Sequence, residues 1–173
     1  MIELRHRPPL HIGDLSGHEQ LNPRILAAFE REQGGPASHQ SHFELGRFEN
    51  SYIERSAIPE IEPLLQLARE TAQDILQRDG LKLGFWFNAM QPGDRTARHN
   101  HEEGDELLSC VYYLRVAPGC GDLLVHHRDG ARRISPKEGR FVFFSPKLAH
   151  EVEENRSQQQ RLSLAFNFGP GNE

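Results

Sequence analysis

The chain has 173 residues, which is enough for one domain with a substantial buried core. Its formal net charge of −5 argues against a general nucleic-acid binder, which normally carries a basic excess. No apolar run approaches the roughly 20 residues that cross a bilayer, and the N-terminus lacks the apolar core of a signal peptide. We therefore expect a single domain, residues 1–173, in a cytoplasmic protein that binds neither nucleic acid nor membranes.

The N-terminal part, residues 1–80, is predicted to be helical or irregular. Asn22 suits the N-cap of a short helix whose first residue is Pro23, and a short extended segment is expected around residues 42–48. Apolar residues then recur with the helical period over residues 58–78. This pattern predicts a second, stronger helix.

From residue 81 onward the apolar pattern changes to the period of β-strands. About seven short strands are expected, separated by turns rich in Gly and Pro. Because the helices come first and the strands follow, parallel βαβ units are disfavoured. We expect a mostly β protein with packed helices: residues 81–168 form a double-stranded β-helix core, the jelly roll also found in cupins, and residues 1–80 pack on its sheet.

Three histidines in the β-rich part are candidate metal ligands. His99 and His101 form a His-x-His pair, and because side chains alternate along a strand, both imidazoles face the same side. His150 follows the aromatic strand RFVFFSP. Imidazole suits iron, zinc, copper or nickel, and three protein ligands leave positions open for substrate or oxygen. By contrast, His42 lies in a polar stretch and is expected to be a solvated surface residue.

The last strand, RLSLAFNF, is predicted to have one apolar and one polar face. Its polar face would carry Arg161, Ser163, Ala165 and Asn167. Burying an unpaired guanidinium is costly, so Arg161 is expected to meet an anion. The planar guanidinium suits a carboxylate in bidentate fashion.

The order and spacing of RHNHEEGDELLSCVYYL, GRFVFFSPKLAHEV and RLSLAFNF within residues 81–168 resemble the Fe(II)/2-oxoglutarate-dependent oxygenases, the superfamily of the prolyl hydroxylases. The pattern is most similar to a group of small bacterial members. The resemblance implies that His99, His101 and His150 bind Fe(II), and that Arg161 with Ser163 holds the distal carboxylate of 2-oxoglutarate. Tyr113 aligns with a tyrosine that touches this carboxylate in some relatives, although it also fits a core position. Asn88, on the preceding strand, is expected to line the pocket.

The activity implied by the resemblance is that of a non-haem Fe(II)- and 2-oxoglutarate-dependent dioxygenase. It would hydroxylate a small molecule or a protein side chain with release of succinate and CO2, using no catalytic side chain beyond the metal ligands. Most of the superfamily has an acidic residue where this chain has His101, so Glu103 or Asp105 is an alternative ligand. The sequence identifies neither the substrate, nor the metal bound in the cell, nor the oligomeric state.

A cupin-type metalloprotein that does not use 2-oxoglutarate is the main alternative. Gly93, the His-x-His pair and Glu106 resemble the opening of the first cupin motif. Such a protein would be an isomerase, another dioxygenase or a sensor. The glycine that closes that motif is missing, and the cupin interpretation gives Arg161 no role. A module that kept the fold without catalysis is a further alternative.

Overall fold

The structure is a computed structural model that describes residues 2–7, 10–101 and 104–171. In chain order its strands and α-helices are β1 (Ile2–Arg7), β2 (Leu10–Leu15), α1 (His18–Glu32), β3 (Ser38–Glu44), β4 (Arg47–Ile53), α2 (Glu62–Leu76), β5 (Leu81–Met90), β6 (Thr96–His99), β7 (Leu108–Arg115), β8 (Leu123–His127), β9 (Gly130–Ile134), β10 (Arg140–Phe144), β11 (His150–Val152) and β12 (Arg161–Pro170). Two short 3-10 helices, η1 (Arg55–Ala57) and η2 (Pro59–Ile61), precede α2.

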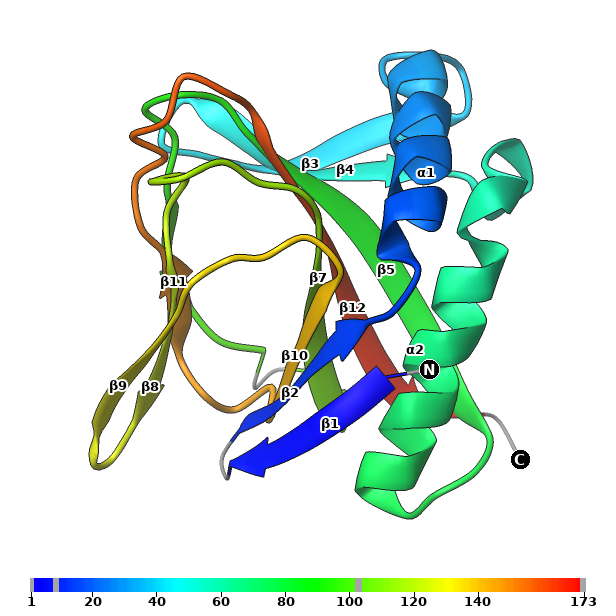
Figure 1. The fold of residues 1–173 in the computed structure, drawn as a ribbon, viewed down its shortest axis with the longest axis vertical. Helices are drawn as coiled ribbons and strands as arrows, with labels where there is room; N and C mark the ends of the chain where they lie inside the picture. The colour runs from blue at the N-terminus through cyan, green and yellow to red at the C-terminus, as the bar shows by residue number, and fades with distance from the viewer. Residues whose placement is uncertain (1, 8–9, 102–103, 172–173) are drawn as a thin grey trace.

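The described strands form two antiparallel sheets (Figure 1). The larger sheet has the order β1-β2-β10-β7-β12-β5-β4-β3, and the smaller has the order β6-β11-β8-β9. Both α-helices cover one side of the larger sheet, and the smaller sheet lies on its other side. The space between the two sheets is therefore where pocket-lining side chains gather.

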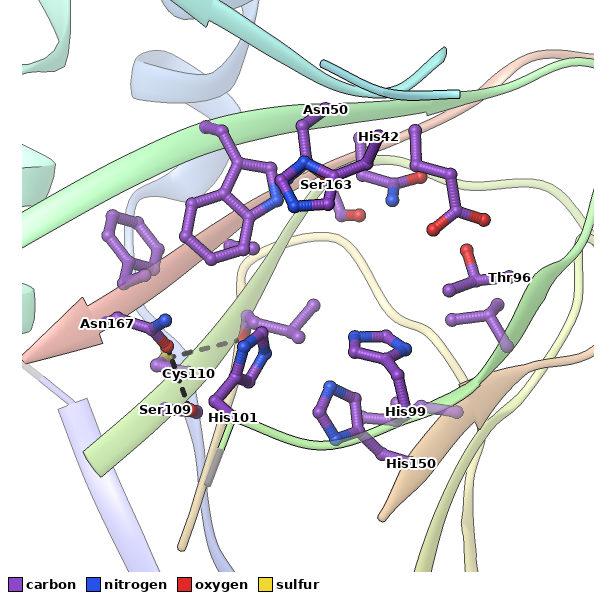
Figure 2. A pocket seen from close by; sticks show the side chains of 18 of the residues that line it. His42, Asn50, Thr96, His99, His101, Ser109, Cys110, His150, Ser163 and Asn167 are labelled. Carbon is purple, nitrogen blue, oxygen red and sulfur yellow. Dashed lines mark hydrogen bonds between the residues drawn. The ribbon is translucent and has the colours of Figure 1, made fainter. Parts of the chain in front are cut away.

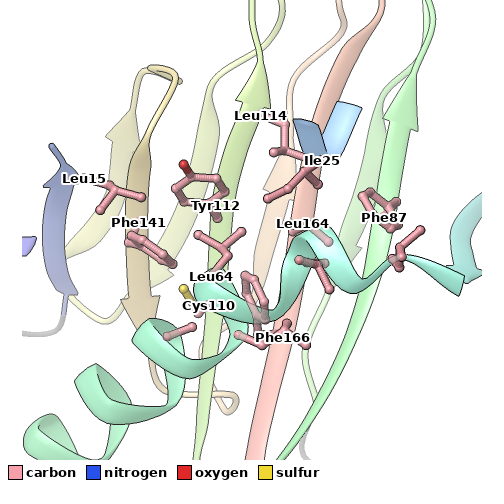
Figure 3. Close-up of a cluster of buried hydrophobic side chains, with 14 of the residues drawn as sticks. Leu15, Ile25, Leu64, Phe87, Cys110, Tyr112, Leu114, Phe141, Leu164 and Phe166 are labelled. Atoms are coloured by element: carbon pink, nitrogen blue, oxygen red, sulfur yellow. The ribbon is translucent and has the colours of Figure 1, made fainter. Parts of the chain in front are cut away.

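Because side chains alternate along the central strands, the side of the larger sheet that faces the helices and the side that faces the smaller sheet carry different residues. The apolar positions of β12 pack in the main core, toward the helices: Leu162, Leu164, Phe166 and Phe168. Figure 3 shows Leu164 and Phe166 beside Leu64 of α2 and Cys110 of β7. Burial raises the pKa of the Cys110 thiol well above its usual value, which fits a reduced core residue. The intervening residues of β12 face the other sheet.

Helix α1 begins five residues earlier than the sequence predicted. Asn22 is not its N-cap: Gly17, with φ of 81°, occupies that position, and Asn22 lies within the helix and is buried. Its amide donates to the carbonyls of Tyr113 and Leu114, and its oxygen accepts a hydrogen bond from the Tyr112 hydroxyl. The asparagine therefore joins the helix to β7, which local capping rules do not reveal.

Most strands in the N-terminal part were not predicted from the sequence. β1 and β2 extend the larger sheet beyond β10, and β3 and β4 form a hairpin that joins β5 through the pair Ser51 and Phe87. The extended segment predicted at residues 42–48 spans the turn of this hairpin. β3 has the largely polar sequence SHQSHFE with little burial, so the apolar alternation that signals a strand is absent. No helix of the described residues is long and apolar enough to span a membrane.

Candidate active site

The three predicted metal-binding histidines come together between the two sheets (Figure 2). His99 ends β6 and His150 begins β11, and the two are direct partners in the antiparallel pairing. His101 lies just beyond β6, where its backbone N–H donates to the carbonyl of Pro146 at 2.9 Å. One ligand nitrogen from each ring lies within 4.8 Å of the others, so the group could hold a metal ion.

Hydrogen bonds prepare two of these rings for coordination. Nδ1 of His99 lies 2.9 Å from the carbonyl oxygen of Ala97, and Nδ1 of His150 lies 3.0 Å from that of Leu148. A carbonyl oxygen only accepts, so Nδ1 carries the proton and Nε2 keeps its free lone pair. Burial, with repulsion from His99, lowers the pKa of His150 to about 3. Burial also lowers the pKa of His101. The imidazoles of His101 and His150 are therefore neutral at pH 7 and available to a metal.

Asp105 and Glu103 were predicted as alternative metal ligands. Asp105 is exposed, and its Oδ2 accepts a hydrogen bond from Lys82 Nζ at 2.6 Å. In the described part of the chain, it does not belong to the group of side chains that could share a metal. Glu103 lies outside the described residues.

A buried guanidinium lies in the same pocket as the histidines. Arg161 is 1% exposed, and its Nη1 donates to Ser163 Oγ at 3.1 Å and contacts Met90 Sδ at 3.5 Å. Its Nε and Nη2 have no hydrogen-bond partner among the described residues. Leaving buried donors unpaired costs about 1–3 kcal/mol each, so a site for an anionic ligand is the natural explanation.

Two further buried polar atoms near this guanidinium are also unpaired within the described chain. They are the hydroxyl of Tyr113 and Oδ1 of Asn88. The Tyr113 ring lies under the guanidinium, with its centroid 5.1 Å from Arg161 Cζ. Asn88, Arg161 and Ser163 line one pocket with the three histidines, whereas Tyr113 is fully buried behind it. The four residues that the sequence predicted for cofactor binding are thus neighbours of one cavity.

The pocket has a volume of about 230 Å³, and its walls are partly aromatic. Trp86 lines it, with its ring centroid 6.3 Å from that of His101, and Phe144 packs edge-on against His150 at 4.8 Å. Phe141 and Phe143 instead belong to the core under the helices. Trp86 and Phe144 are therefore placed to limit the access of water to the space between the histidines.

Residues 85–169 match the family model of the 2OG-Fe(II) oxygenase superfamily. The matched segment, which holds the three histidines and Arg161, belongs to this superfamily. The chain is therefore an oxygenase, an oxidoreductase whose cofactors are Fe(II) and 2-oxoglutarate, as the sequence predicted. The donor set fits both: three imidazole nitrogens suit Fe(II), and the unpaired guanidinium suits a carboxylate. No protein of curated function matches the chain in sequence.

Solved structures of oxygenases share the fold. A prolyl-4-hydroxylase of Pseudomonas putida superposes with a TM-score of 0.67 at 19% identity, covering 95% of this chain and 89% of that one. A prolyl hydroxylase of Trichoplax adhaerens, solved with a peptide of hypoxia inducible factor, gives 0.73 at 12% identity, covering 93% and 83%. A 2OG-Fe(II) oxygenase family protein of Burkholderia pseudomallei gives 0.63 at 17% identity, covering 91% and 92%. These likenesses confirm the predicted double-stranded β-helix.

The β3–β4 hairpin reaches the pocket of this oxygenase, which was not predicted from the sequence. The hairpin contributes His42, Glu44, Glu49 and Asn50 to the lining. His42 is exposed, as expected of a surface residue, yet it also lines the pocket and has φ of 57°. A histidine with a positive φ is uncommon, and the register of β3 with β4 is the same on both sides of His42. The Leu-Gly pair of the two-residue turn, at residues 45–46, was the available hairpin signal.

The ring of His42 is held in place within the hairpin. The Ser41 hydroxyl lies 2.6 Å from its Nδ1, and the Asn50 amide donates to the same atom at 3.1 Å. In Figure 2, His42 and Asn50 lie across the pocket from the three histidines. The hairpin therefore forms the wall opposite the three histidines.

Proposed function

We propose that this oxygenase binds Fe(II) through His99, His101 and His150 and hydroxylates a C–H bond of its substrate, with release of succinate and CO2. The observation that carries the proposal is the buried Arg161, whose Nε and Nη2 are unpaired in the described chain and which shares a pocket with three histidines that could hold a metal. Dioxygen would be the oxidant, and the chemistry that bound Fe(II) and 2-oxoglutarate would supply is its activation, so that one oxygen atom enters the substrate and the other enters succinate.

Arg161 has the central role in positioning the co-substrate. Its free Nε and Nη2 would donate in parallel to the distal carboxylate of 2-oxoglutarate, while Ser163 accepts from Nη1 and fixes the plane of the guanidinium. The Tyr113 hydroxyl is a further donor for the same carboxylate, and Asn88 lines the space beside it. Burial of this end of the pocket strengthens each of these charge-assisted bonds.

The histidines and aromatic walls would hold the metal in a dry setting. His99 and His150 are oriented by their backbone hydrogen bonds, so each presents Nε2 to the ion. Trp86 and Phe144 limit the access of water to the same space. The cupin alternative leaves the unpaired guanidinium without a ligand, which favours the oxygenase assignment.

The test is an anaerobic titration. Metal-free protein receives Fe(II) and then 2-oxoglutarate, and the visible spectrum is followed for the charge-transfer band of a chelated keto acid. We expect a band that requires both additions. Arg161→Lys keeps the charge but loses the planar donor pair, so it should weaken 2-oxoglutarate binding at least about tenfold without changing Fe(II) binding.

Arg132→Lys, on an exposed position of β9, is the matched control. Circular dichroism checks that each variant is folded. No band despite bound Fe(II), or a band indifferent to Arg161→Lys, would contradict these assignments. Admission of oxygen should then release succinate and CO2 in equal amounts.

A further inference from the structure

We infer that the pocket selects a substrate with a positively charged amine or guanidinium group, and that Glu49 binds this group. The inference rests on the proposed function, because it assigns the substrate class of the same pocket. It is carried by the charges on the pocket walls, the partners of Glu49 and the position of Trp86.

The formal charges on the pocket lining are divided between its two ends. Apart from the histidines, the charged lining residues in the described chain are Arg161, Glu44 and Glu49. Arg161 lies on β12 at the end proposed for 2-oxoglutarate, whereas both glutamates come from the β3–β4 hairpin. The part of the pocket left for the substrate therefore carries two carboxylates and no cationic side chain among the described lining residues. Such a wall attracts cations and repels anions.

Glu49 is the carboxylate of this pair that is buried. It is 7% exposed, whereas Glu44 is exposed. Burial raises the pKa of the Glu49 carboxyl, because the charged form has lost much of its water. A buried carboxylate is stabilised by any cation that reaches it, and each of its oxygens has room for more than one donor.

The internal partners of Glu49, which are Arg47 and Thr96, leave part of that capacity unused. Among the described residues its ion pair is with Arg47, whose Nη2 lies 3.4 Å from Oε1. That guanidinium also lies 3.8 Å from Asp94 and donates to Thr96 Oγ1 at 3.1 Å. One cation is thus shared by two carboxylates over long distances. Glu49 keeps a negative charge toward the pocket that a substrate cation can neutralise.

Trp86 provides the second element of a cation site. Its indole lines the same pocket, and its ring centroid lies 6.2 Å from that of Tyr52 on the hairpin. The face of an indole attracts ammonium and guanidinium groups, worth about 0.5–2 kcal/mol depending on solvent exposure. A carboxylate and an indole on the walls of one pocket are a combination suited to an organic cation. The β3–β4 hairpin, which carries His42 and Glu49, lies across the pocket from the three histidines.

The experiment uses Trp86 as its own reporter, because it is the single tryptophan of the chain. Protein loaded anaerobically with Fe(II) and 2-oxoglutarate is titrated with three probes of equal length: n-butylammonium, 1-butanol and butyrate. Loading fills the Arg161 end, so butyrate cannot bind there. Fluorescence gives the dissociation constant of each probe, and the charge-transfer band is recorded in the same sample.

We expect n-butylammonium to bind at least about tenfold more tightly than 1-butanol, and butyrate to bind least. Glu49→Gln, which keeps the shape of the side chain, should remove the preference for the cation. Glu54→Gln, at an exposed position outside the pocket lining, is the control and should leave it unchanged. Circular dichroism verifies the fold of both variants.

Equal binding of the three probes, tighter binding of butyrate, no response to any probe, or a cation preference that survives Glu49→Gln would overturn the inference. The charge-transfer band separates this failure from that of the proposed function. A band without cation preference rejects only the substrate class, and a cation preference without a band rejects only the cofactor assignments.

Discussion

His99 and His150 face each other directly across the pairing of β6 with β11, and their ring centroids are 4.3 Å apart. Each ring is anchored at Nδ1 by a carbonyl two residues earlier in its own chain segment. The two strands thus present the same donor atom from the same local geometry. His101 completes the group from outside the strand, with centroids 5.3 Å from both partners. The group of three histidines is therefore built mainly by sheet register.

Replacing one of the paired histidines should abolish tight metal binding. In His150→Asn the imidazole Nε2 is lost, so the Fe(II) dissociation constant should rise by at least about 100-fold, more than the usual effect of a residue that only supports a ligand. Anaerobic equilibrium titration with Fe(II) measures it. His127→Asn, at a position outside the pocket lining, serves as the control. Unchanged affinity in His150→Asn would show that the ion binds elsewhere.

An acidic residue in place of His101 should preserve metal binding. The superfamily mostly has a carboxylate at this place, and Asp is short enough to occupy the space of the His101 ring. We expect His101→Asp to stay within about tenfold of the wild-type Fe(II) affinity and His101→Ala to fall at least tenfold below it. The same titration compares the three proteins. If His101→Ala binds as tightly as His101→Asp, position 101 does not contribute a ligand.

The strands in the β-rich half of the chain could be predicted because local sequence patterns mark where each strand begins and ends. Each strand segment expected after residue 80 appears as β5, β7, β8, β9, β10, β11 or β12, since the period-two pattern and Gly or Pro turns mark their ends. The two faces of β12 also follow from alternation alone, which placed Arg161 in the pocket. That His99 and His150 lie together could be predicted only from the family resemblance, because β6 and β11 pair although about 50 residues of sequence separate them.

The parts that were missed depend on partners far away in the chain. β3 is polar and exposed, and it is a strand because its backbone pairs with β4, not because of burial. Glu49 reads as an ordinary surface acid, and it is buried through its contacts with Arg47 and Thr96. Asn22 resembles a helix cap until β7 supplies its partners. Sequence pattern indicates which residues are apolar, whereas these roles depend on tertiary contacts.

The link between α1 and β7 should be important for stability. Asn22→Leu would leave the Tyr112 hydroxyl without its acceptor at 2.6 Å and would remove the donor to two backbone carbonyls. We expect the free energy of unfolding to fall by about 2–4 kcal/mol, because buried polar groups lose their partners. Urea unfolding followed by circular dichroism measures the change. Gln20→Ala, exposed on the same helix, should change it little, and a similar effect of both substitutions would argue against a specific role of Asn22.

The ion pairs of Asp14 should make stability depend on pH in the acid range. Arg140 and Lys137 donate to this carboxylate, each at 2.8 Å, and they lower its pKa from 3.8 to about 2. A carboxyl whose folded pKa is depressed contributes stability above its unfolded pKa and loses it as the pH falls through the folded value. Wild type should therefore be more stable than Asp14→Asn at pH 7, and the difference should shrink between about pH 4 and pH 2. Thermal unfolding of both proteins across this range measures it, with Asp74→Asn on exposed α2 surface as the control. A difference that is constant from pH 7 to pH 2 would mean that the charge of Asp14 does not stabilise the contact between β2 and β10.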